Sequence, residues 1–437
     1  MYMKFEDVQT MYALFLTQKR VTSVDVMRKF NTSKPSAIKM LNYLEAIAIG
    51  KSVSRFYILP IKVKDIGSQW NIYQVDEEAN IAKIGVLHNT SDGFYFDADY
   101  PSFFGNEFDK KIFPGIPWFL NEHRPQGYVG RNIVYNLSKS FGISNDLKSW
   151  NDKDIINYAV RFGDDLSGAL VVGDDAKNVF LQGRDADIEE SARRKMYPVF
   201  AREAISNGVP RSSAAGEQPK FCALIKSTDN TYRNVIVKFT GEMNNDINRR
   251  WADLLVCEYI ALQVLGKYGF PVAKAELIQS ENRMFLEYDR IDRVGRYGRR
   301  MTSSLTGIDS AFIGVGDGPW AEAMRKASEY FDASEIEMVE RIYNFGFAIG
   351  NTDMHFGNIS FYLPRELPFK LAPIYDMLPM HYAPLSDNSL RSEPLKSIPP
   401  TKESKELAKE FWETVKKHTK VSDNFKKIAE ENLKTLS

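Results

Sequence analysis

Three polar residues late in the chain have the types and the spacing that phosphoryl transfer from ATP requires. Asp353 and Asn358 stand five positions apart, and Asp376 follows Asn358 by eighteen positions, after a short apolar run. In sites of this kind one aspartate accepts the proton of the attacking hydroxyl, the asparagine binds a metal ion, and a second aspartate binds the Mg²⁺ ions on the ATP phosphates. The pattern therefore predicts a chain that transfers phosphoryl groups.

A lysine within an apolar strand and a glutamate within an apolar helix precede these residues. Lys238 lies in the expected strand 235–239, and Glu258 lies in a helix expected over 249–267. A buried lysine is costly unless it is paired. In kinases such a lysine contacts the α- and β-phosphates and pairs with a helical glutamate. A strand-edge lysine and an exposed glutamate are the alternative that these two segments leave open.

Three further segments fit the same order. A loop of small residues, 211–220, can bring backbone N–H groups near phosphates, and an ordinary hairpin loop is the alternative. Residues 284–293 run from a strand into a charged segment, where a kinase has the hinge whose backbone binds adenine. A long helix expected over 334–350 then leads to Asp353. His355 has no second histidine nearby, so we interpret it as a hydrogen-bonding brace of the catalytic loop rather than a metal ligand.

In this order the motifs resemble the HipA family of bacterial Ser/Thr kinases, the toxins of persistence-linked toxin–antitoxin pairs. The resemblance covers about residues 70–437, and it implies an α+β, kinase-like two-lobed fold with an N-terminal β-rich subdomain. We expect that subdomain over 70–150, an N-lobe-like region over 151–292 and a helical C-lobe over 293–437. The motifs that carry the resemblance are Ser213–Lys220, Val237-Lys238, Cys257-Glu258, Arg290–Arg293, Asp353–Asn358 and Tyr375-Asp376.

The resemblance also implies roles for individual residues. Asp353 corresponds to the catalytic base, Asn358 and Asp376 correspond to the Mg²⁺ ligands, and ATP is the phosphoryl donor. Ser213 corresponds to the loop serine that family kinases autophosphorylate, and a phosphate there adds roughly −1.5 to −2 charge, which would eject the loop and switch off ATP binding. The expected nucleotide-binding residues are Ser213, Ala214, Ala215, Gly216, Lys238, Glu258, Asp289, Arg290, Ile291 and His355.

The chain departs from the family pattern at three points. Pro219 stands where the family usually has an acidic residue before the lysine, which affects the geometry of the loop. Ile291 replaces the usual aromatic residue of the hinge, which reduces packing against adenine. Family toxins usually leave DNA binding to a separate antitoxin, whereas here a basic head is fused to the N-terminus. In this respect the chain resembles the longer, single-protein branch of the family with an N-terminal DNA-binding domain.

Residues 1–64 are predicted to form a winged helix-turn-helix. Helices are expected over 6–18, from a cap at Thr22-Ser23 to Phe30, and from Lys34 through Ile47 to Gly50, followed by a strand over 51–59. The third helix would enter the major groove of DNA, and the strand would form a wing against phosphates. The candidate DNA contacts are Lys34, Ser36, Lys39 and Asn42 on the helix, and Lys51 and Arg55 on the wing.

Charge is spread unevenly along the chain. Residues 1–64 contain eleven Lys and Arg against four Asp and Glu, a net charge of +7, while the whole chain is neutral. A basic head on a mildly acidic body favours an anionic partner for the head. The alternative is a small helical dimerisation module with a solvated basic face. Helix-turn-helix heads commonly act as dimers on two half-sites, so a homodimer is compatible with the first interpretation.

Composition favours a cytoplasmic protein. Cys222 and Cys257 are the only cysteines in 437 residues, which is typical of a reducing compartment. The sequence has neither an apolar run of ~18 residues nor the layout of a signal peptide, so we expect no membrane association.

The resulting interpretation is a bacterial toxin-type Ser/Thr protein kinase with a DNA-binding head. The family resemblance points to an aminoacyl-tRNA synthetase or another translation factor as the protein substrate. The head would let the protein repress its own operon, or it would dock an antitoxin. The alternative is a DNA-binding transcriptional regulator whose kinase-like body senses ATP without phosphorylating a partner, although the intact Lys238, Asp353, Asn358 and Asp376 argue against a dead site.

Overall fold

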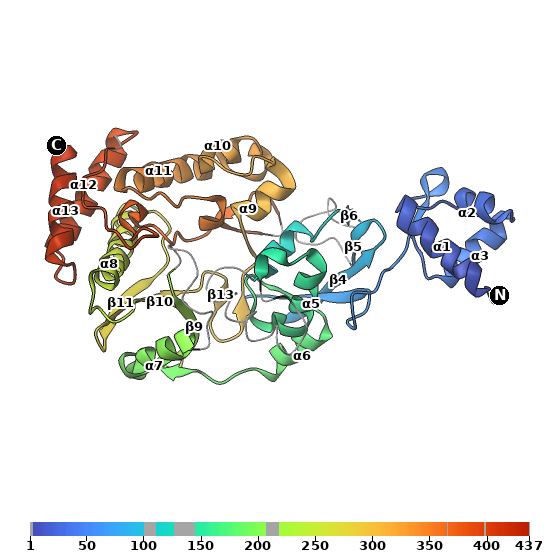
Figure 1. Ribbon diagram of the computed structural model, residues 1–437, viewed down its shortest axis with the longest axis horizontal. Helices are drawn as coiled ribbons and strands as arrows, with labels where there is room; N and C mark the ends of the chain where they lie inside the picture. The colour runs from blue at the N-terminus through green and yellow to red at the C-terminus, as the bar shows by residue number, and fades with distance from the viewer. Residues whose placement is uncertain are drawn as a thin grey trace.

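The computed structural model describes residues 3–99, 111–125, 144, 146–206, 218–364, 366–396 and 399–436. Within them the chain forms a helical head, two five-stranded sheets with flanking helices, and a helical C-terminal part (Figure 1). The head lies at one end of an elongated molecule, and the C-terminal helices lie at the other. None of the helices within these ranges is long and apolar enough to span a membrane.

The head packs three helices against a two-stranded hairpin. Met11, Phe15 and Leu41 are fully buried in its core, and the side chains of Thr22 and Asp25 cap the second helix reciprocally. The elements are α1 Phe5–Gln18, α2 Ser23–Phe30, α3 Lys34–Tyr43, β1 Ile47–Ile49 and β2 Phe56–Ile58.

The end of the third helix differs from the expectation. The helix ends at Tyr43, not at Gly50, and Ile47 lies in β1 opposite Ile58 of β2. An apolar run of three or four residues satisfies a strand as well as a helix, and the antiparallel partner decides between them. The expected strand over 51–59 is likewise shortened to Phe56–Ile58, after a 3₁₀ turn at Ser52–Ser54.

The first five-stranded sheet is antiparallel throughout, in the order β6-β5-β4-β3-β7. Its strand β7 comes from beyond residue 150, so the sheet includes a segment that we expected in the N-lobe-like region. The head meets this sheet where Arg20 pairs with Asp92 and the Ser91 hydroxyl donates to the carbonyl of Lys19. The elements are β3 Gln69–Val75, β4 Ile81–Thr90, β5 Gly93–Ala98, β6 Lys111–Phe113, β7 Leu170–Val172, α5 Asp152–Phe162 and α6 Asp174–Gln182, with 3₁₀ turns at Trp118–His123, Leu147–Ser149 and Gly163–Asp165.

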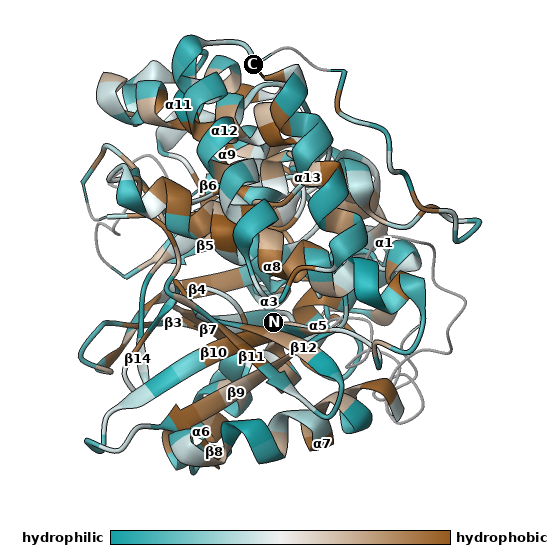
Figure 2. Cartoon of the chain, turned by 90° about the vertical axis from the view of Figure 1, so that its left-hand side faces the viewer, coloured by the Kyte–Doolittle hydropathy of each residue, from teal (hydrophilic) through white to brown (hydrophobic). Residues whose placement is uncertain are grey.

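The second sheet has the order β11-β12-β10-β9-β8, with only β8 parallel to its neighbour. Helices α7 and α8 cover its two faces (Figure 2). Because side chains alternate along a strand, Val237 and Phe239 face α7, whereas Lys238 and its neighbour Leu286 face α8. The elements are β8 Ile188–Glu189, a 3₁₀ turn at Glu190–Ala192, α7 Arg193–Ser206, β9 Lys220–Lys226, β10 Tyr232–Phe239, α8 Asp246–Lys267, β11 Ala275–Ser280 and β12 Arg283–Asp289.

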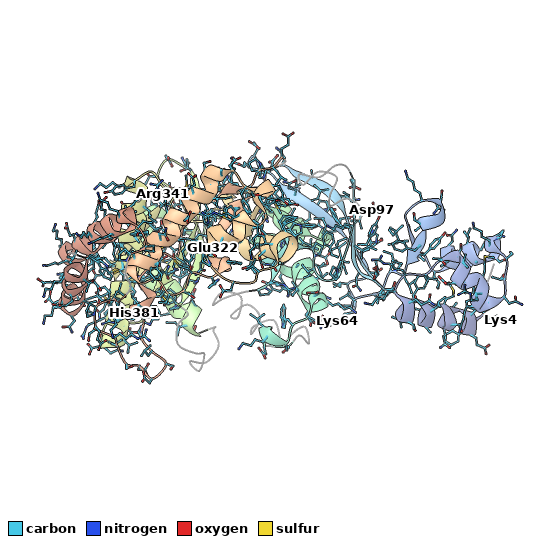
Figure 3. The ribbon with its side chains drawn as sticks, turned by 90° about the horizontal axis from the view of Figure 1, so that it is seen from above. Lys4, Lys64, Asp97, Glu322, Arg341 and His381 are labelled. Atoms are coloured by element: carbon cyan, nitrogen blue, oxygen red, sulfur yellow. The ribbon has the colours of Figure 1, made fainter. Side chains whose placement is uncertain are left out.

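The rest of the chain is mostly helical. Helix α11 ends at Gly350, whose φ of 81° and close approach to Leu395 favour glycine. Seen from above, Lys4 of the head and Arg341 of α11 lie far apart along the molecule (Figure 3). The elements are β13 Arg293–Val294, β14 Gly298–Arg299, β15 Thr302–Ser304, α9 Leu305–Ile308, a π-helical turn Asp309–Ile313, α10 Trp320–Arg325, α11 Ala333–Ile349, β16 Ser360–Tyr362, β17 Lys370–Leu371, α12 Lys402–Lys417 and α13 Asp423–Thr435, with 3₁₀ turns at Ser328–Tyr330, Phe356–Asn358 and Met380–Tyr382.

Candidate active site

Lys238 and Glu258 form a buried ion pair at the centre of the candidate site. The Nζ atom of Lys238 lies 2.8 and 2.9 Å from the two carboxylate oxygens of Glu258. The two side chains are 5% and 0% exposed. Strand β10 presents the lysine to α8, and α8 presents the glutamate from its inward face. The pairing predicted from the sequence is therefore present, and the exposed arrangement is excluded.

Asp376 joins this pair from a third part of the chain. Its carboxylate forms an ion pair with Lys238, and its backbone N–H donates to Oε1 of Glu258 at 3.1 Å. The hydroxyl of Tyr288 donates to the same oxygen at 2.7 Å. Asp376 has a left-handed backbone, with φ of 54°, which a non-glycine residue adopts only where its surroundings hold it. Glu258 thus links β10, α8, β12 and the segment after β17.

The loop from Asp353 to Asn358 is held by its own hydrogen bonds. Nδ2 of Asn358 donates to the Asp353 carbonyl at 2.7 Å, and the Asp353 N–H donates to Oδ1 of Asn351 at 3.1 Å. Nδ1 of His355 accepts from the Gly357 N–H at 3.0 Å, which is the bracing contact expected of this histidine. The Asp353 side chain is 54% exposed. Its carboxylate is therefore accessible to a hydroxyl of another protein.

Asn358 and Asp376, the expected Mg²⁺ ligands, offer an amide oxygen and a carboxylate of the kind that Mg²⁺ binds. Because Nδ2 of Asn358 is used within the loop, its Oδ1 is the atom left for a cation. Amide and carboxylate oxygens are the ligands that Mg²⁺ prefers, and Mg²⁺ usually completes its shell with waters and substrate phosphates. Within the described ranges no group of three or more His, Cys, Asp and Glu side chains is arranged to hold a metal ion.

Lys220, the last residue of the Ser213–Lys220 motif, is a charged neighbour of Lys238 for which the sequence predicted no separate role. It stands opposite Lys238 in the antiparallel register of β9 and β10, so both lysines lie on the same face of the sheet. Burial lowers the pKa of Lys238 to about 8, an effect that Lys220 reinforces and that Glu258 opposes. Two lysines at the end of this hairpin, where the small-residue loop joins it, favour an anionic ligand. The sequence feature that could have revealed this contact is that Lys220 and Lys238 are equally far from the turn that joins β9 and β10.

Comparisons with known proteins agree with this geometry. The profile of a HipA-like C-terminal domain matches residues 212–436, and that of the middle domain of YjjJ-like toxins matches residues 66–181. Toxin YjjJ of Escherichia coli (strain K12) is 35% identical over 338 residues, which cover 75% of this chain and 76% of that protein. The chain belongs to the HipA family. The middle-domain match extends past residue 150 and includes β7, as the first sheet does.

A solved structure shows the same fold. HipA of Shewanella oneidensis MR-1, determined with HipB and operator DNA, has a TM-score of 0.51 and 15% identity, over 84% of this chain and 95% of that one. The Helicobacter pylori proinflammatory kinase CtkA matches more weakly, with a TM-score of 0.33 and 12% identity over 52% of this chain and 91% of that one. This HipA-family chain therefore has the mixed helix and strand fold of HipA.

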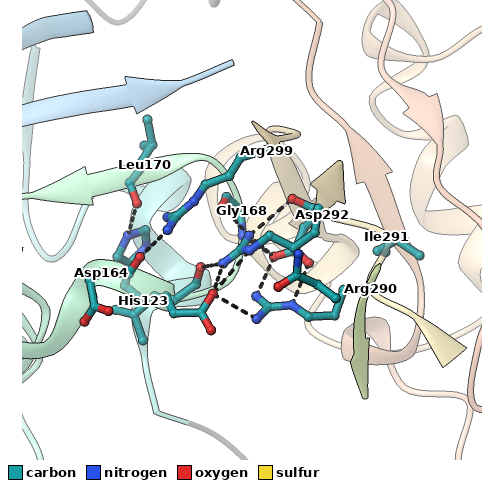
Figure 4. A network of polar contacts seen from close by, with 12 residues as sticks. His123, Asp164, Gly168, Leu170, Arg290, Ile291, Asp292 and Arg299 are labelled. Carbon is teal, nitrogen blue, oxygen red and sulfur yellow. Dashed lines mark hydrogen bonds and ion pairs between the residues drawn. The ribbon is translucent and has the colours of Figure 1, made fainter. Parts of the chain in front are cut away.

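The polar side chains of the hinge, Asp289 and Arg290, are paired with other residues of the protein. The Asp289 carboxylate accepts from Arg233. The guanidinium of Arg290 is buried against Asp292 (Figure 4). The Ile291 carbonyl accepts from a tyrosine hydroxyl at 3.1 Å. The backbone N–H groups of Asp289 and Arg290 also donate within the protein, to the carbonyls of Lys274 and Asn234 at 3.1 and 2.8 Å. Adenine binding by this segment therefore stays a prediction.

The small-residue loop lies outside the described residues, and with it the expected nucleotide contacts Ser213, Ala214, Ala215 and Gly216. Its C-terminal border is described. The Pro219 carbonyl accepts from the Phe239 N–H at 3.0 Å, so the pairing of β9 and β10 begins at this proline. A proline at position 219, where the family usually has an acidic residue, therefore does not disrupt the pairing at the start of β9.

The expected DNA contacts of the head lie on one helix and the adjoining hairpin. Lys34, Lys39 and Asn42 of α3 are exposed, as are Lys51 and Arg55 between β1 and β2. Ser36 differs, because its hydroxyl is half-buried and lies 3.1 Å from that of Ser33, the N-cap of α3. The Ser36 hydroxyl is thus placed to stabilise the first turn of α3 rather than to contact DNA.

Proposed function

We propose that this HipA-family protein is a Ser/Thr protein kinase that transfers the γ-phosphate of ATP to a protein hydroxyl. The observation that carries the proposal is the contact of Lys238 with both Glu258 and Asp376. A structural lysine is neutralised by one carboxylate. Here a second carboxylate contacts the same ammonium group, next to the loop that exposes Asp353. This arrangement is expected in a kinase, where the ATP phosphates bind the lysine and a metal ion binds the aspartate.

In the proposed reaction each residue has one task. Lys238 binds the α- and β-phosphates, the hinge backbone binds adenine, and Asn358 and Asp376 would hold Mg²⁺. Bound Mg²⁺ supplies charge stabilisation for the phosphate oxygens. The substrate oxygen forms a bond to the γ-phosphorus, the bond to the β,γ-bridging oxygen breaks, and ADP leaves. Asp353 accepts the hydroxyl proton, and positioning accounts for most of the acceleration.

The proposal extends to the enzyme's own loop and to its substrate. Ser213 would be the first hydroxyl phosphorylated, and its phosphate would weaken ATP binding through added negative charge. Family resemblance favours a translation factor, such as an aminoacyl-tRNA synthetase, as the protein substrate. A phosphoproteome of cells that express the wild type or an Asp353 variant would identify that substrate.

Asp353→Asn tests the assignment, because the amide keeps the shape of the side chain and cannot accept the proton. We expect transfer of radiolabelled γ-phosphate, to the protein itself and to added lysate, to fall on the order of 10²-fold or more. Asp423→Asn is the matched control, because Asp423 is 95% exposed on α13, and it should retain full transfer. An Asp353→Asn protein that labels Ser213 at the wild-type rate would refute the proposed base.

We further propose that the head binds DNA as a winged helix-turn-helix. The exposed Lys34, Lys39 and Asn42 on α3, with Lys51 and Arg55 on the hairpin, support this proposal. HipA of Shewanella oneidensis MR-1 is seen with HipB and operator DNA, and a fused head would serve autoregulation here or dock an antitoxin. DNA binding without phosphoryl transfer would favour the ATP-sensing regulator instead.

A further inference from the structure

A cluster of arginines lies beside the hinge, and its ion pairs extend to Asp292 and Asp185, outside the residues that line its centre. It surrounds a hollow of about 110 Å³ where the turn after α5, the end of α6 and the β13–β14 hairpin meet. Figure 4 shows Arg299 and Asp164 beside the polar contacts of Arg290 and Asp292. The charged residues that line the hollow are Arg184, Arg293, Arg296, Arg299, Asp164 and Asp165, a net charge of +2.

Arg299 is the arginine whose charge is least compensated. The residue is 4% exposed, and its Nη1 has no hydrogen-bond partner among the residues that the structure describes. Its Nη2 donates to the backbone carbonyl of Asp164, and its guanidinium lies 4.7 Å from the centroid of the Phe180 ring. Burial lowers the pKa of Arg299 to about 9, and Arg293 lowers it further. A buried charged donor without an acceptor is costly.

Asp165 and Asp292 are already engaged with other arginines. Oδ1 of Asp165 lies 2.8 Å from Arg293 and 3.1 Å from Arg290. Asp292 also pairs with both of these arginines, at 2.7 and 3.0 Å. Asp164 contacts Arg299 through its carbonyl rather than its carboxylate. No described residue therefore provides an acceptor for Nη1 of Arg299.

We propose that this hollow binds a phosphoryl oxyanion. A guanidinium donates in a planar fork that matches phosphate oxygens. The hollow of about 110 Å³ is smaller than the pockets of drug-sized ligands, which start at roughly 300 Å³, and its size therefore favours a small anion. Free phosphate and a phosphorylated side chain share the required chemistry.

Such an anion would join two parts of the molecule. Arg184 follows α6 and belongs to the region that packs on the first sheet, whereas Arg296 and Arg299 belong to the hairpin that follows the hinge. Asn234 of β10 also lines the hollow, and its carbonyl accepts from the Arg290 N–H at 2.8 Å. An oxyanion held by these arginines would fix the hinge against the first sheet, away from Lys238 at the other end of β10.

The test is calorimetric titration of the full chain with inorganic phosphate and with O-phosphoserine, at constant ionic strength set by chloride. We expect saturable binding that weakens at least about tenfold, or 1.4 kcal/mol, in Arg299→Gln. Arg296→Gln is the second variant, for the case that Arg299→Gln does not fold. The Arg296 side chain is 29% exposed, so its replacement should not disturb the core. Tighter binding of O-phosphoserine would assign the site to a phosphorylated side chain, and tighter binding of phosphate to the free ion.

Two controls separate this site from the nucleotide site. Lys238→Met should lose phosphoryl transfer and keep phosphate binding, so the kinase proposal and this one fail independently. Arg202→Gln removes an arginine that is 54% exposed on α7 and should leave affinity unchanged. Equal phosphate affinity in wild type, Arg299→Gln and Arg296→Gln, or loss of binding in Lys238→Met alone, would overturn the proposal.

Discussion

His123 is a histidine whose protonation the fold restricts. It is 2% exposed at the end of the 3₁₀ turn Trp118–His123, and its Nε2 lies 3.2 Å from the carbonyl of Leu170 in β7. Burial lowers its pKa to about 4, the hydrogen bond to Leu170 opposes that shift, and Arg299 and Arg293 add to it. The ring is therefore neutral in the folded protein at neutral pH and joins the turn to the first sheet.

Acid should weaken the fold through this residue. The folded pKa of about 4 lies below the ordinary value of 6.5, so the unfolded chain binds more protons between these values. The stability that the neutral ring provides is complete above pH 6.5 and is lost as pH falls toward 4. We expect a loss of about 2 kcal/mol between pH 7.5 and pH 5, measured by urea unfolding. In His123→Gln this part of the pH dependence should disappear, and an unchanged slope would contradict the assignment.

At the scale of elements, Glu287 fastens α7 to the second sheet. This residue of β12 is fully buried and accepts hydrogen bonds from Arg193 and Tyr197 of α7 and from Arg233 of β10. Helix α7 ends at Ser206, directly before the loop that carries Ser213 in the sequence. The buried carboxylate therefore fixes the helix from which that loop departs.

Glu287→Ala should destabilise the protein strongly, because it removes a fully buried carboxylate that two partly buried arginines and Tyr197 share. We expect a loss of roughly 3 kcal/mol or more in urea unfolding. Arg202→Gln, which breaks the exposed pair of α7 with Glu281, serves as the control and should cost less than about 1 kcal/mol. Equal costs for the two variants would show that the buried network does not fasten α7.

Elements in which a periodic apolar pattern extends over many residues were predictable from the sequence. The pairing of short strands with partners far along the chain was not. Helix α11 begins and ends within one residue of the expectation, because its inward face repeats over the whole helix and glycine ends it. Strand β1 forms against β2 where a helix was expected, and the apolar run 169–173 indicates a strand without revealing that β7 pairs with β3. The same holds at the site. The pairing of Lys238 with Glu258 followed from the cost of a buried lysine, but Tyr288 needed the register of β12.

At the scale of the whole molecule, the head and the candidate active site are separate units. Figure 1 places α3 at one end and α8 near the other. The head has its own core and touches the first sheet through the Arg20–Asp92 ion pair and the Ser91–Lys19 hydrogen bond. Substitutions on the exposed face of α3 should therefore change DNA binding without changing phosphoryl transfer.

The double substitution Lys34→Gln with Lys39→Gln tests this separation. Each lysine that contacts a phosphate contributes about 0.9 to the slope of log affinity against log salt. We expect the slope of log affinity against log salt to fall in magnitude by about two. Binding of a duplex from upstream of the gene, measured by fluorescence anisotropy, should weaken. Transfer of labelled phosphate should stay at the wild-type rate. The matched control replaces Lys402 and Lys417, which are 90% and 77% exposed on α12, and should leave both properties intact. Unchanged affinity and slope in the α3 variant would remove DNA binding from the head, and a parallel loss of transfer would show that the two ends are coupled through the first sheet.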